Sequence, residues 1–409
     1  MKSRLMTLIP AALICAGCTH KDTLTVTVTN PIGLDRMGEM IEVPMEEVSE
    51  RLNLGNSGQP VVTDGQGEEV PSQITYDGRL IFPANVKADA QATYTISRGQ
   101  PAEVPVTACG REYPERDDDL AWENDQVAFR AYGPALQARG ERGYGYDLFC
   151  KRGTTEPVLE DMYAKHLNPD SWKQVNELRK TDPKAAAELE STFSYHIDHG
   201  QGMDCYAVGP TLGAGTAALM YDGELLYPWC YDKAEILDNG PLRFSVRLTF
   251  KPMQAGPDQT VTETRLITLD AGSHLNKTEL TYSGLSQSLP LATGIVLHDK
   301  QGAVSASAGQ GFIAYEDPTT GPDNGKIYVG AAFVTPPDKA ETRPLDGKDK
   351  PSGVEGHVLG ISTYKPGTTY TYYWGYGWNR SDMPDFGTWT RYLEQHVQKI
   401  QHPLDVHTD

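Results

Sequence analysis

The chain has 409 residues and a formal net charge of −19, and 39% of its residues are hydrophobic. This acidity argues against a nucleic-acid partner, because phosphate binding needs a basic face. The chain also lacks the glycine motifs of nucleotide and dinucleotide sites and the GxSxG motif of esterases. Its 40 Gly and 28 Pro indicate a globular protein of two domains, rich in strands and turns.

The first 18 residues are typical of an export signal. Two basic residues precede an apolar run, residues 5–16, that is too short to span a bilayer. The run ends in Cys15-Ala-Gly-Cys18, which resembles a bacterial lipobox, although Leu usually stands where this chain has Cys15. We therefore predict a signal peptide over 1–18 and a lipid anchor on Cys18. Because residues 19–22 lack an acidic surface-export tag, we expect an outer-membrane lipoprotein that faces the periplasm; an ordinary cleaved signal is the alternative.

Four cysteines remain after the signal, at positions 109, 150, 205 and 230. Their spacing fits no CxxC zinc pattern. They lie in a compartment that permits disulfides, but four cysteines allow three pairings, and buried free thiols are equally compatible with the sequence. The sequence therefore predicts no particular pairing.

The chain then begins with a small β domain, which we place at residues 22–108. Residues 23–29 alternate strictly between polar and apolar side chains, the clearest strand pattern in the sequence. Further short runs, separated by Gly, Asp and Pro, predict the strands 40–48, 73–76, 80–82 and 92–97. The charged stretch 111–119 is expected to be a linker or a strap lying across the second domain.

The second domain, residues 109–409, is predicted to be mainly β with one helical insertion. Its Ala and Glu content favours two short helices within 171–191, separated at Asp182-Pro183, and 389–400 is expected to form a final helix. Long strands are predicted at 242–250, 261–269, 275–282, 291–297, 311–315, 326–333, 357–364 and 369–378. So many strands indicate two large antiparallel sheets packed face to face.

The segment 194–212, SYHIDHGQGMDCYAVGPTL, contains two His, two Asp and two Tyr between glycines. A solvated loop or a plain strand would not carry this density of proton-transfer and ligand groups, so we expect the segment to face a site. A second signal is the aromatic run 370–378, whose rings could stack on pyranose faces. We expect Trp378 and Arg380 at its end to contact a ligand, whereas Tyr373 and Tyr376 could equally fill the core between the sheets.

Several long motifs resemble one family. Trp122-Glu-Asn-Asp-Gln-Val-Ala-Phe-Arg-Ala-Tyr-Gly-Pro134, Tyr146-Asp-Leu-Phe-Cys-Lys-Arg152, Tyr195-His-Ile-Asp-His-Gly-Gln-Gly-Met-Asp204 and Tyr206-Ala-Val-Gly-Pro-Thr-Leu-Gly213 are similar to the domain of unknown function 4861. The resemblance covers nearly the whole mature chain. It implies a galactose-mutarotase-like β super-sandwich and a role beside polysaccharide-utilisation enzymes of Bacteroidetes. Some members look like dehydratases that remove water from a terminal uronic acid.

The chemistry of such an elimination defines the roles that the chain must fill. Removal of the hydrogen at C5 of a uronic acid, with loss of the C4 substituent, needs a base, an acid and a group that neutralises the carboxylate. His199 or His196 could be the base and Tyr206 the acid. Arg130 could pair with the carboxylate, and Asn124 could donate to it.

Other polar residues are candidates for substrate or metal binding. Asp204 could orient a histidine or ligate a metal, His166 could reach over the groove from the insertion, and His298 begins a second polar cluster. The reaction requires no cofactor, or else a divalent metal held by His196, His199, Asp204 and His298. The C-terminal histidines 396, 402 and 407 are expected to lie in a solvated tail.

We therefore predict a carbon–oxygen lyase that converts uronate-containing oligosaccharides to 4,5-unsaturated products. One alternative is a glycoside hydrolase or sugar epimerase on the same scaffold, with paired carboxylates such as Glu123 and Asp204. Another is a lipoprotein that binds glycans without turning them over. The aromatic run fits all three functions, while the density of His, Asp and Tyr favours an enzyme.

Overall fold

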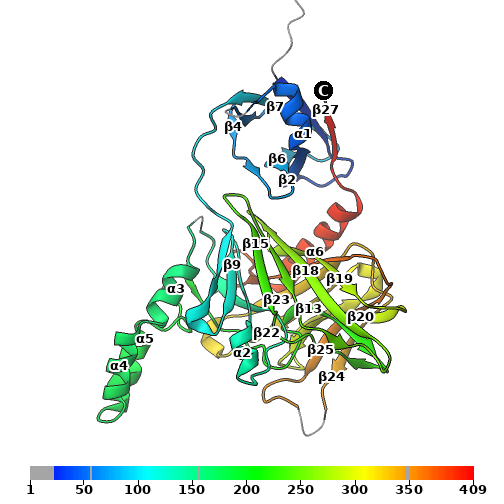
Figure 1. Cartoon of the computed structure of the whole chain (residues 1–409). Helices are drawn as coiled ribbons and strands as arrows, with labels where there is room; N and C mark the ends of the chain where they lie inside the picture. The colour runs from blue at the N-terminus through cyan, green and yellow to red at the C-terminus, as the bar shows by residue number, and fades with distance from the viewer. Residues whose placement is uncertain (1–22, 56–57, 155, 347–349) are drawn as a thin grey trace, which may run out of the picture.

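The computed structural model describes residues 23–55, 58–154, 156–346 and 350–409. It confirms a mainly β protein, with a large antiparallel sandwich, a small β domain formed largely by the N-terminal segment, and a helical insertion (Figure 1). The predicted signal peptide and Cys18 lie outside the described residues. In the described ranges, no helix combines the length and the apolar character that a membrane crossing requires.

One layer of the sandwich is a single long sheet. Its strands follow the order β15 (Lys233–Asn239), β16 (Arg243–Thr249), β18 (Thr260–Asp270), β19 (Leu275–Ser283), β26 (Tyr370–Trp378), β23 (Ile327–Phe333), β22 (Phe312–Asp317) and β21 (Val304–Ser307), with β17 (Met253–Gln254) paired to β18. The long strands predicted from residue 242 onward all form, and their ends shift by two residues or fewer. Regular alternation of apolar residues made these strands predictable.

The opposite layer consists of two five-stranded sheets. One has the order β12 (Gly202–Met203), β11 (Asp147–Lys151), β10 (Ala128–Ala131), β9 (Asp119–Glu123) and β8 (Cys109–Tyr113). The other has the order β14 (Glu224–Leu225), β13 (Ala214–Tyr221), β20 (Leu289–Leu297), β25 (Gly356–Tyr364) and β24 (Lys339–Pro344). The two meet at a parallel bridge between Tyr146 and Gly213, where a Cβ on Gly145 would lie 2.2 Å from the Leu212 backbone. Glycine is therefore required at this junction.

The main core lies between the two layers and is rich in aromatic rings. Tyr146, directly before β11, stacks on Trp374 of β26 with ring centroids 3.9 Å apart, and Trp122 and Phe129 pack around them. Tyr372, Tyr376 and Trp378 are buried in the same core. The aromatic run of β26 therefore holds the two layers together, and the expectation that Trp378 is exposed to ligand is wrong.

The small domain contains two sheets and one helix. The sheets are β27 (Asp405–Thr408), β1 (Thr23–Thr29), β7 (Gln91–Gly99), β3 (Gln59–Thr63) and β4 (Glu69–Val70), and β2 (Arg36–Pro44), β6 (Arg79–Val86) and β5 (Gln73–Ile74). The strand predicted at 40–48 is wrong beyond Pro44, because α1 (Met45–Leu52) begins there. Its buried residues, Val48 and Leu52, are four apart, which is helical rather than strand spacing.

The C-terminus returns to this domain, so the boundary predicted at 109–409 does not describe the last strand. After α6 (Phe386–Gln401), which covers the outer face of β22 and β23, the chain forms β27 and pairs with β1 (Figure 1). His407 lies opposite Thr27 in this ladder, and His396 is packed against Tyr373. The expectation of a solvated tail is therefore wrong for His396, whereas His407 lies in a strand but keeps a largely exposed side chain.

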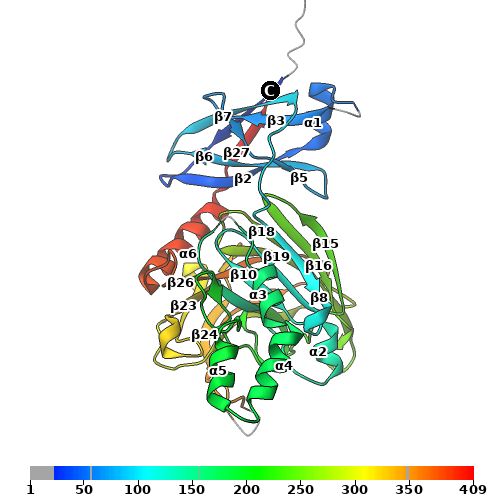
Figure 2. The same ribbon diagram turned by 90° about the vertical axis from the view of Figure 1, so that its left-hand side faces the viewer.

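The helical insertion is confirmed and is longer than expected. α4 (Pro169–Leu178) and α5 (Pro183–Ser191) form the predicted pair, and α3 (Leu159–His166) precedes them. α4 and α5 project as a hairpin beyond the sandwich, while α3 packs on β9 (Figure 2). The stretch expected to be a linker at 111–119 is instead the end of β8, the turn Pro114–Arg116 and the start of β9. The remaining helix, α2 (Pro134–Ala138), follows β10.

Candidate functional site

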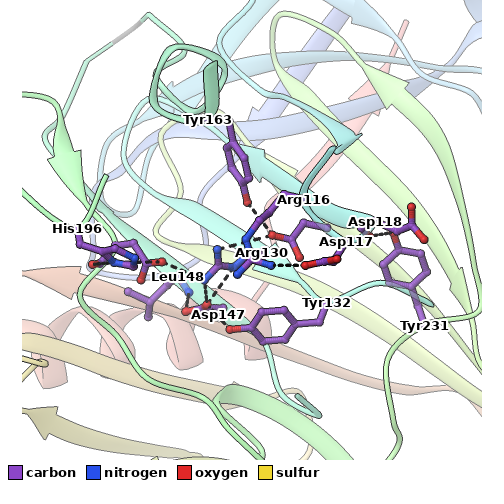
Figure 3. A network of polar contacts seen from close by, with 12 residues as sticks. Arg116, Asp117, Asp118, Arg130, Tyr132, Asp147, Leu148, Tyr163, His196 and Tyr231 are labelled. Carbon is purple, nitrogen blue, oxygen red and sulfur yellow. Dashed lines mark hydrogen bonds and ion pairs between the residues drawn. The ribbon is translucent and has the colours of Figure 1, made fainter. Parts of the chain in front are cut away.

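A buried cluster of charges lies on the face of β9, β10 and β11 that points away from the main core. Phe129 and Leu148 face that core, so their neighbours Arg130 and Asp147 point outward and lie opposite each other in the ladder. Asp119 from β9 and Asp204 from the loop after β12 join them through ion pairs with Arg130, which lies in the middle of the network in Figure 3. We refer to these four residues as the Arg130 cluster.

The guanidinium of Arg130 is surrounded by carboxylates of the protein. Its Nε lies 3.0 Å from Asp147 Oδ2, its Nη2 contacts Asp147 and lies 3.0 Å from Asp204 Oδ2, and its Nη1 lies 3.6 Å from Asp119 Oδ2. All four side chains are buried. The prediction that Arg130 binds the carboxylate of a substrate is therefore wrong, because the protein's own aspartates already surround it.

Burial controls the ionisation of this cluster. It raises the pKa of Asp119 to about 6, against the opposing charges of Arg130 and Arg116. Burial also raises the pKa of Asp204, again opposed by Arg130. Three carboxyl groups around one guanidinium thus share a site in which one of them, Asp119, changes charge close to neutral pH.

The Arg130 cluster reaches solvent through Tyr132 and His196 (Figure 3). The Tyr132 hydroxyl donates to Asp147 Oδ2 over 2.6 Å. The Nδ1 atom of His196 lies 3.1 Å from the Asp204 carbonyl oxygen and 3.8 Å from its carboxylate, and 58% of the side chain is exposed. His196 and Asp204, both predicted site residues, are therefore neighbours.

His166 joins this group from the end of α3, as its position in the insertion suggested. Its ring stacks on Tyr195 at 3.7 Å and meets His196 edge-on at 5.6 Å. Its Nδ1 accepts from the Tyr195 backbone N–H at 3.4 Å. Burial, followed by the charges of His196 and Arg116, lowers the pKa of His166 to about 4, so this imidazole is neutral at neutral pH.

A second centre contains Tyr206, His298 and Asp317, which come from three separate chain segments. His298 follows β20, Asp317 ends β22, and Tyr206 lies in the loop after β12. His298 Nδ1 lies 2.6 Å from Asp317 Oδ2, and its ring faces Tyr206 edge-on at 5.6 Å. We refer to these three residues as the His298 centre.

The two proton-transfer atoms of the His298 centre have no protein partner. Among the described residues, nothing lies within hydrogen-bonding distance of His298 Nε2 or of the Tyr206 hydroxyl, and both atoms are buried. Because the carboxylate of Asp317 accepts the Nδ1 proton, Nε2 of a neutral His298 presents its lone pair. Burial raises the pKa of Tyr206 well above its usual value, and the charges of Asp317 and Asp147 raise it further, so Tyr206 keeps its proton.

Two residues that the sequence analysis missed lie beside this centre. His357 accepts from the Leu212 backbone N–H through Nε2 at 3.1 Å and lies opposite Arg343 in the ladder of β24 and β25. Burial lowers the pKa of His357 to about 3, and the charges of Arg343 and His298 lower it further. No sequence signal marks either residue: His357 is the one ionisable side chain of a predicted strand before its terminal tyrosine, and Arg343 lies in a polar segment that was not predicted to form a strand.

Other predicted site residues have structural contacts instead. Asn124 is buried, its amide donates to the Asp270 and Ser273 carbonyls at 2.6 and 2.8 Å, and its oxygen accepts two backbone N–H groups. The indole N–H of Trp378 donates to the Asn324 carbonyl at 2.9 Å. The predictions of substrate binding by Asn124 and Trp378 are therefore wrong, since neither has a free polar group.

His199 and Arg380 are exposed and belong neither to the Arg130 cluster nor to the His298 centre. His199 Nε2 is 3.1 Å from the Ser194 carbonyl oxygen in its own loop, and Arg380 donates to the Asp323 carbonyl. In the parts of the chain that the structure describes, no three His, Cys, Asp or Glu side chains are grouped as a metal site would need. The four predicted metal ligands are thus divided: His196 adjoins Asp204, whereas His298 pairs with Asp317.

An aromatic recess borders the Arg130 cluster through Tyr132. Its lining includes Tyr144, Trp229, Tyr231 and Arg265. Tyr144 stacks on Tyr227 at 4.9 Å and meets Trp229 edge-on at 6.2 Å. These three rings are partly exposed, so they can present their faces to a ligand.

Comparisons with known proteins give one family and several distant relatives. The model of the family described as "Domain of unknown function (DUF4861)" matches residues 28–406. "Uncharacterized protein P7" of Formosa agariphila is 25% identical over 421 residues, which cover 97% of both proteins.

The solved structures that resemble this chain do so weakly. An alpha-mannosidase from Enterococcus faecalis V583 has a TM-score of 0.43 and 10% identity; the match covers 95% of this chain but only 46% of the mannosidase. A putative aldose 1-epimerase from Klebsiella pneumoniae has a TM-score of 0.25 and 9% identity, with 93% of this chain and 96% of the epimerase covered. The present chain thus spans about half the length of the mannosidase.

Proposed function

This chain belongs to the DUF4861 family, and we propose that it is a carbohydrate-active lyase that acts on a uronic acid of an oligosaccharide. It removes water, or a sugar, from C4 and leaves a 4,5-unsaturated uronate. The observation that carries the proposal is the His298 centre, where an aspartate-held imidazole faces a protonated tyrosine and both reactive atoms lack partners among the described residues.

In the proposed reaction, His298 is the base and Tyr206 the acid; because both reactive atoms are buried in the substrate-free chain, the side chains that cover them must move aside when the uronate binds. His298 Nε2 takes the proton from C5, the electrons of that bond form the C4–C5 double bond, and the C4–O bond breaks. Tyr206 gives its proton to the departing oxygen, so that no alkoxide is released. Asp317 stabilises the imidazolium that forms. The reaction ends when the proton on His298 is returned to Tyr206 through solvent.

Positive charge near the centre supports the binding of a carboxylate. Arg343 of β24 lies opposite His357 in the ladder of β24 and β25, and His357 in turn lies opposite Val296, two residues before His298. Its Nε and Nη2 contact Glu341 at 3.1 and 2.8 Å, and its side chain is 31% exposed. In the proposal, Arg343 exchanges part of this contact for the uronate and neutralises the charge that develops during proton removal.

The aromatic recess is the proposed binding place for the neighbouring sugar ring. Tyr144, Tyr227 and Trp229 offer ring faces for stacking on the C–H face of a pyranose.

In this proposal the mature protein acts in the periplasm, held to the outer membrane by a lipid on Cys18. An oligosaccharide is therefore a more suitable substrate than a long polymer.

The test is to mix the purified protein with oligosaccharides that end in glucuronate or galacturonate, with and without a chelator. We expect the absorbance of a conjugated unsaturated uronate to rise. A product lighter than the substrate by one water indicates a dehydratase, whereas two shorter fragments indicate an exo-lyase. Loss of the signal with chelator assigns a metal to the reaction.

If no product with a double bond forms, the proposal is overturned in favour of one of the alternatives. Hydrolysed sugar would indicate a glycosidase, although Glu123, one of the carboxylates first considered for it, is bound by Lys151 and by two backbone N–H groups of α3. A change of configuration without any mass change would indicate an epimerase. Retention of glycan without any product would indicate a binding protein.

A further inference from the structure

Two thiols lie in contact inside the sandwich. Cys150 is in β11, Cys205 follows β12, and their Sγ atoms are 3.4 Å apart. Each residue is 1% exposed and packs in the main core. The Cys230 thiol instead donates to the Gly143 carbonyl at 3.4 Å, and Cys109 is only partly buried. The fold thus selects one of the pairings that the sequence left open.

We propose that Cys150 and Cys205 form a disulfide when the protein folds in an oxidising compartment. The two Sγ atoms need to approach from 3.4 Å to about 2.05 Å, which small side-chain rotations can provide. A thiolate of one cysteine attacks an external disulfide, and the thiolate of the other then displaces that partner. The two thiols lose two protons and two electrons, and the external disulfide is reduced to two thiols.

The bond forms before the core closes. In the folded chain, burial raises the pKa of Cys150 well above its usual value, and the neighbouring thiol of Cys205 raises it further. A thiol in this environment is rarely ionised and cannot be reached by an oxidant. The same burial protects the finished disulfide from reductants, so the folded protein keeps the redox state that the two cysteines had when the core formed.

The position of the bond gives it a role in the site. It closes the chain between β11 and the loop after β12, which includes the whole insertion α3–α5. Cys205 lies between Asp204 of the Arg130 cluster and Tyr206 of the His298 centre. The bond therefore fixes both residues to the strand that carries Asp147, whatever reaction the site performs. It also restricts the unfolded chain, which stabilises the fold.

The test is to refold the full chain in a glutathione redox buffer, block free thiols with an alkylating reagent under denaturing conditions, and digest without reduction. We expect one peptide that joins Cys150 to Cys205 and is lighter by two hydrogens than the sum of its parts, while Cys109 and Cys230 are alkylated. Alkylation of all four would overturn the proposal. The Cys109→Ser variant, as a matched control, should keep the joined peptide, and Cys150→Ser should lose it.

A second measurement compares the thermal unfolding midpoints of two samples. One is the oxidised chain, and the other is the same chain after it has been reduced under denaturing conditions and then refolded. The oxidised chain should unfold several degrees above the reduced chain. In the Cys150→Ser/Cys205→Ser variant, the two treatments should give the same midpoint. An equal midpoint in the unaltered chain would contradict a stabilising bond.

Discussion

At the scale of single residues, an unpartnered buried atom is the most informative feature of this molecule. A buried hydroxyl without a partner loses its bonds to water and gains nothing in return, which costs about 1–3 kcal/mol. Tyr206 and His298 each leave such an atom, and their rings face each other. A substrate that bonds to both atoms would remove this cost.

The first prediction concerns the hydroxyl of Tyr206. In the Tyr206→Phe variant we expect the rate of elimination to fall by about 10²–10⁴-fold, since the acid is lost. The free energy of unfolding should not decrease, because the hydroxyl has no partner to lose. Rates on uronate oligosaccharides and urea unfolding measure the two effects. Tyr372→Phe is the matched control: its hydroxyl is also buried and unpartnered among the described residues, but its ring packs against Tyr370 of β26 rather than against His298.

The second prediction concerns the pH dependence of stability through Asp119. Its folded pKa of about 6 lies above its usual value of 3.8, so between these pH values the folded state binds the proton that the unfolded state has released. Stability therefore falls as pH rises from about 4 to about 6, by up to roughly 3 kcal/mol for this group. Urea unfolding at several pH values should show this fall in the unaltered chain relative to Asp119→Asn. If the unfolding free energies of the unaltered chain and of Asp119→Asn differed by the same amount at every pH, the prediction would be contradicted.

Part of the site could be predicted from the sequence. The density of His, Asp and Tyr in 194–212 pointed to Tyr206, Asp204 and His196, and all three lie in the site or beside it. His298 was also a candidate, but its pairing with Tyr206 and Asp317 could not be predicted. Asp317 and His298 meet only because β20 and β22 end near each other, and that proximity depends on sheet topology rather than on sequence spacing.

At the scale of elements, β9, β11 and α3 are joined by one buried ion pair. Lys151 Nζ lies 2.6 Å from Glu123 Oε2, and the Glu123 carboxylate also accepts from the first backbone N–H groups of α3, Val158 and Leu159. A carboxylate at a helix N-terminus satisfies donors that the helix itself leaves unpaired. This residue therefore attaches the insertion to the sandwich.

The third prediction follows from this attachment. Glu123→Ala should lower the free energy of unfolding by about 3–5 kcal/mol, because it leaves the buried charge of Lys151 without an opposite charge, with only backbone carbonyl acceptors such as that of Asn124. Urea unfolding measures the loss. Removing the charge as well, in Glu123→Gln/Lys151→Met, should recover part of it. A loss below about 1 kcal/mol in Glu123→Ala would show that water already reaches Lys151.

The elements themselves differed in how well the sequence predicted them. In the long sheet, β18 and β19 alternate between an apolar core face and a polar face, and both were placed to within two residues. The strands β9, β10 and β11 are buried on both faces, by the main core and by α3, so they show no alternation, and the Arg130 cluster on them could not be located in advance. The stretch 111–119 was misread for another reason, because its charged residues belong to the short strand β8 and the turn after it.

At the scale of the whole molecule, the net charge of −19 acts on any anionic substrate. Repulsion between like charges slows the approach of a uronate at low salt, and ions screen it over about 8 Å at physiological ionic strength. Local cations such as Arg343 act only at short range, so they do not cancel this field.

The fourth prediction is a salt effect on substrate capture. Raising the ionic strength from about 0.01 to about 0.15 M should increase kcat/KM for an oligosaccharide with several uronates. An oligosaccharide whose only charge is a single terminal uronate is the control and should respond less. A fall in kcat/KM with salt would instead indicate long-range attraction, and would require a basic substrate channel that the proposed site lacks.

The central claim is that His298 removes the proton from C5 of a uronate. The most direct measurement uses a terminal uronate that carries deuterium at C5 and follows the product by mass spectrometry. The account predicts that the unsaturated product has lost the deuterium, that the labelled substrate reacts more slowly than the unlabelled one, and that His298→Gln abolishes the reaction. A product that keeps the deuterium, or a His298→Gln variant that reacts at the normal rate, would contradict it.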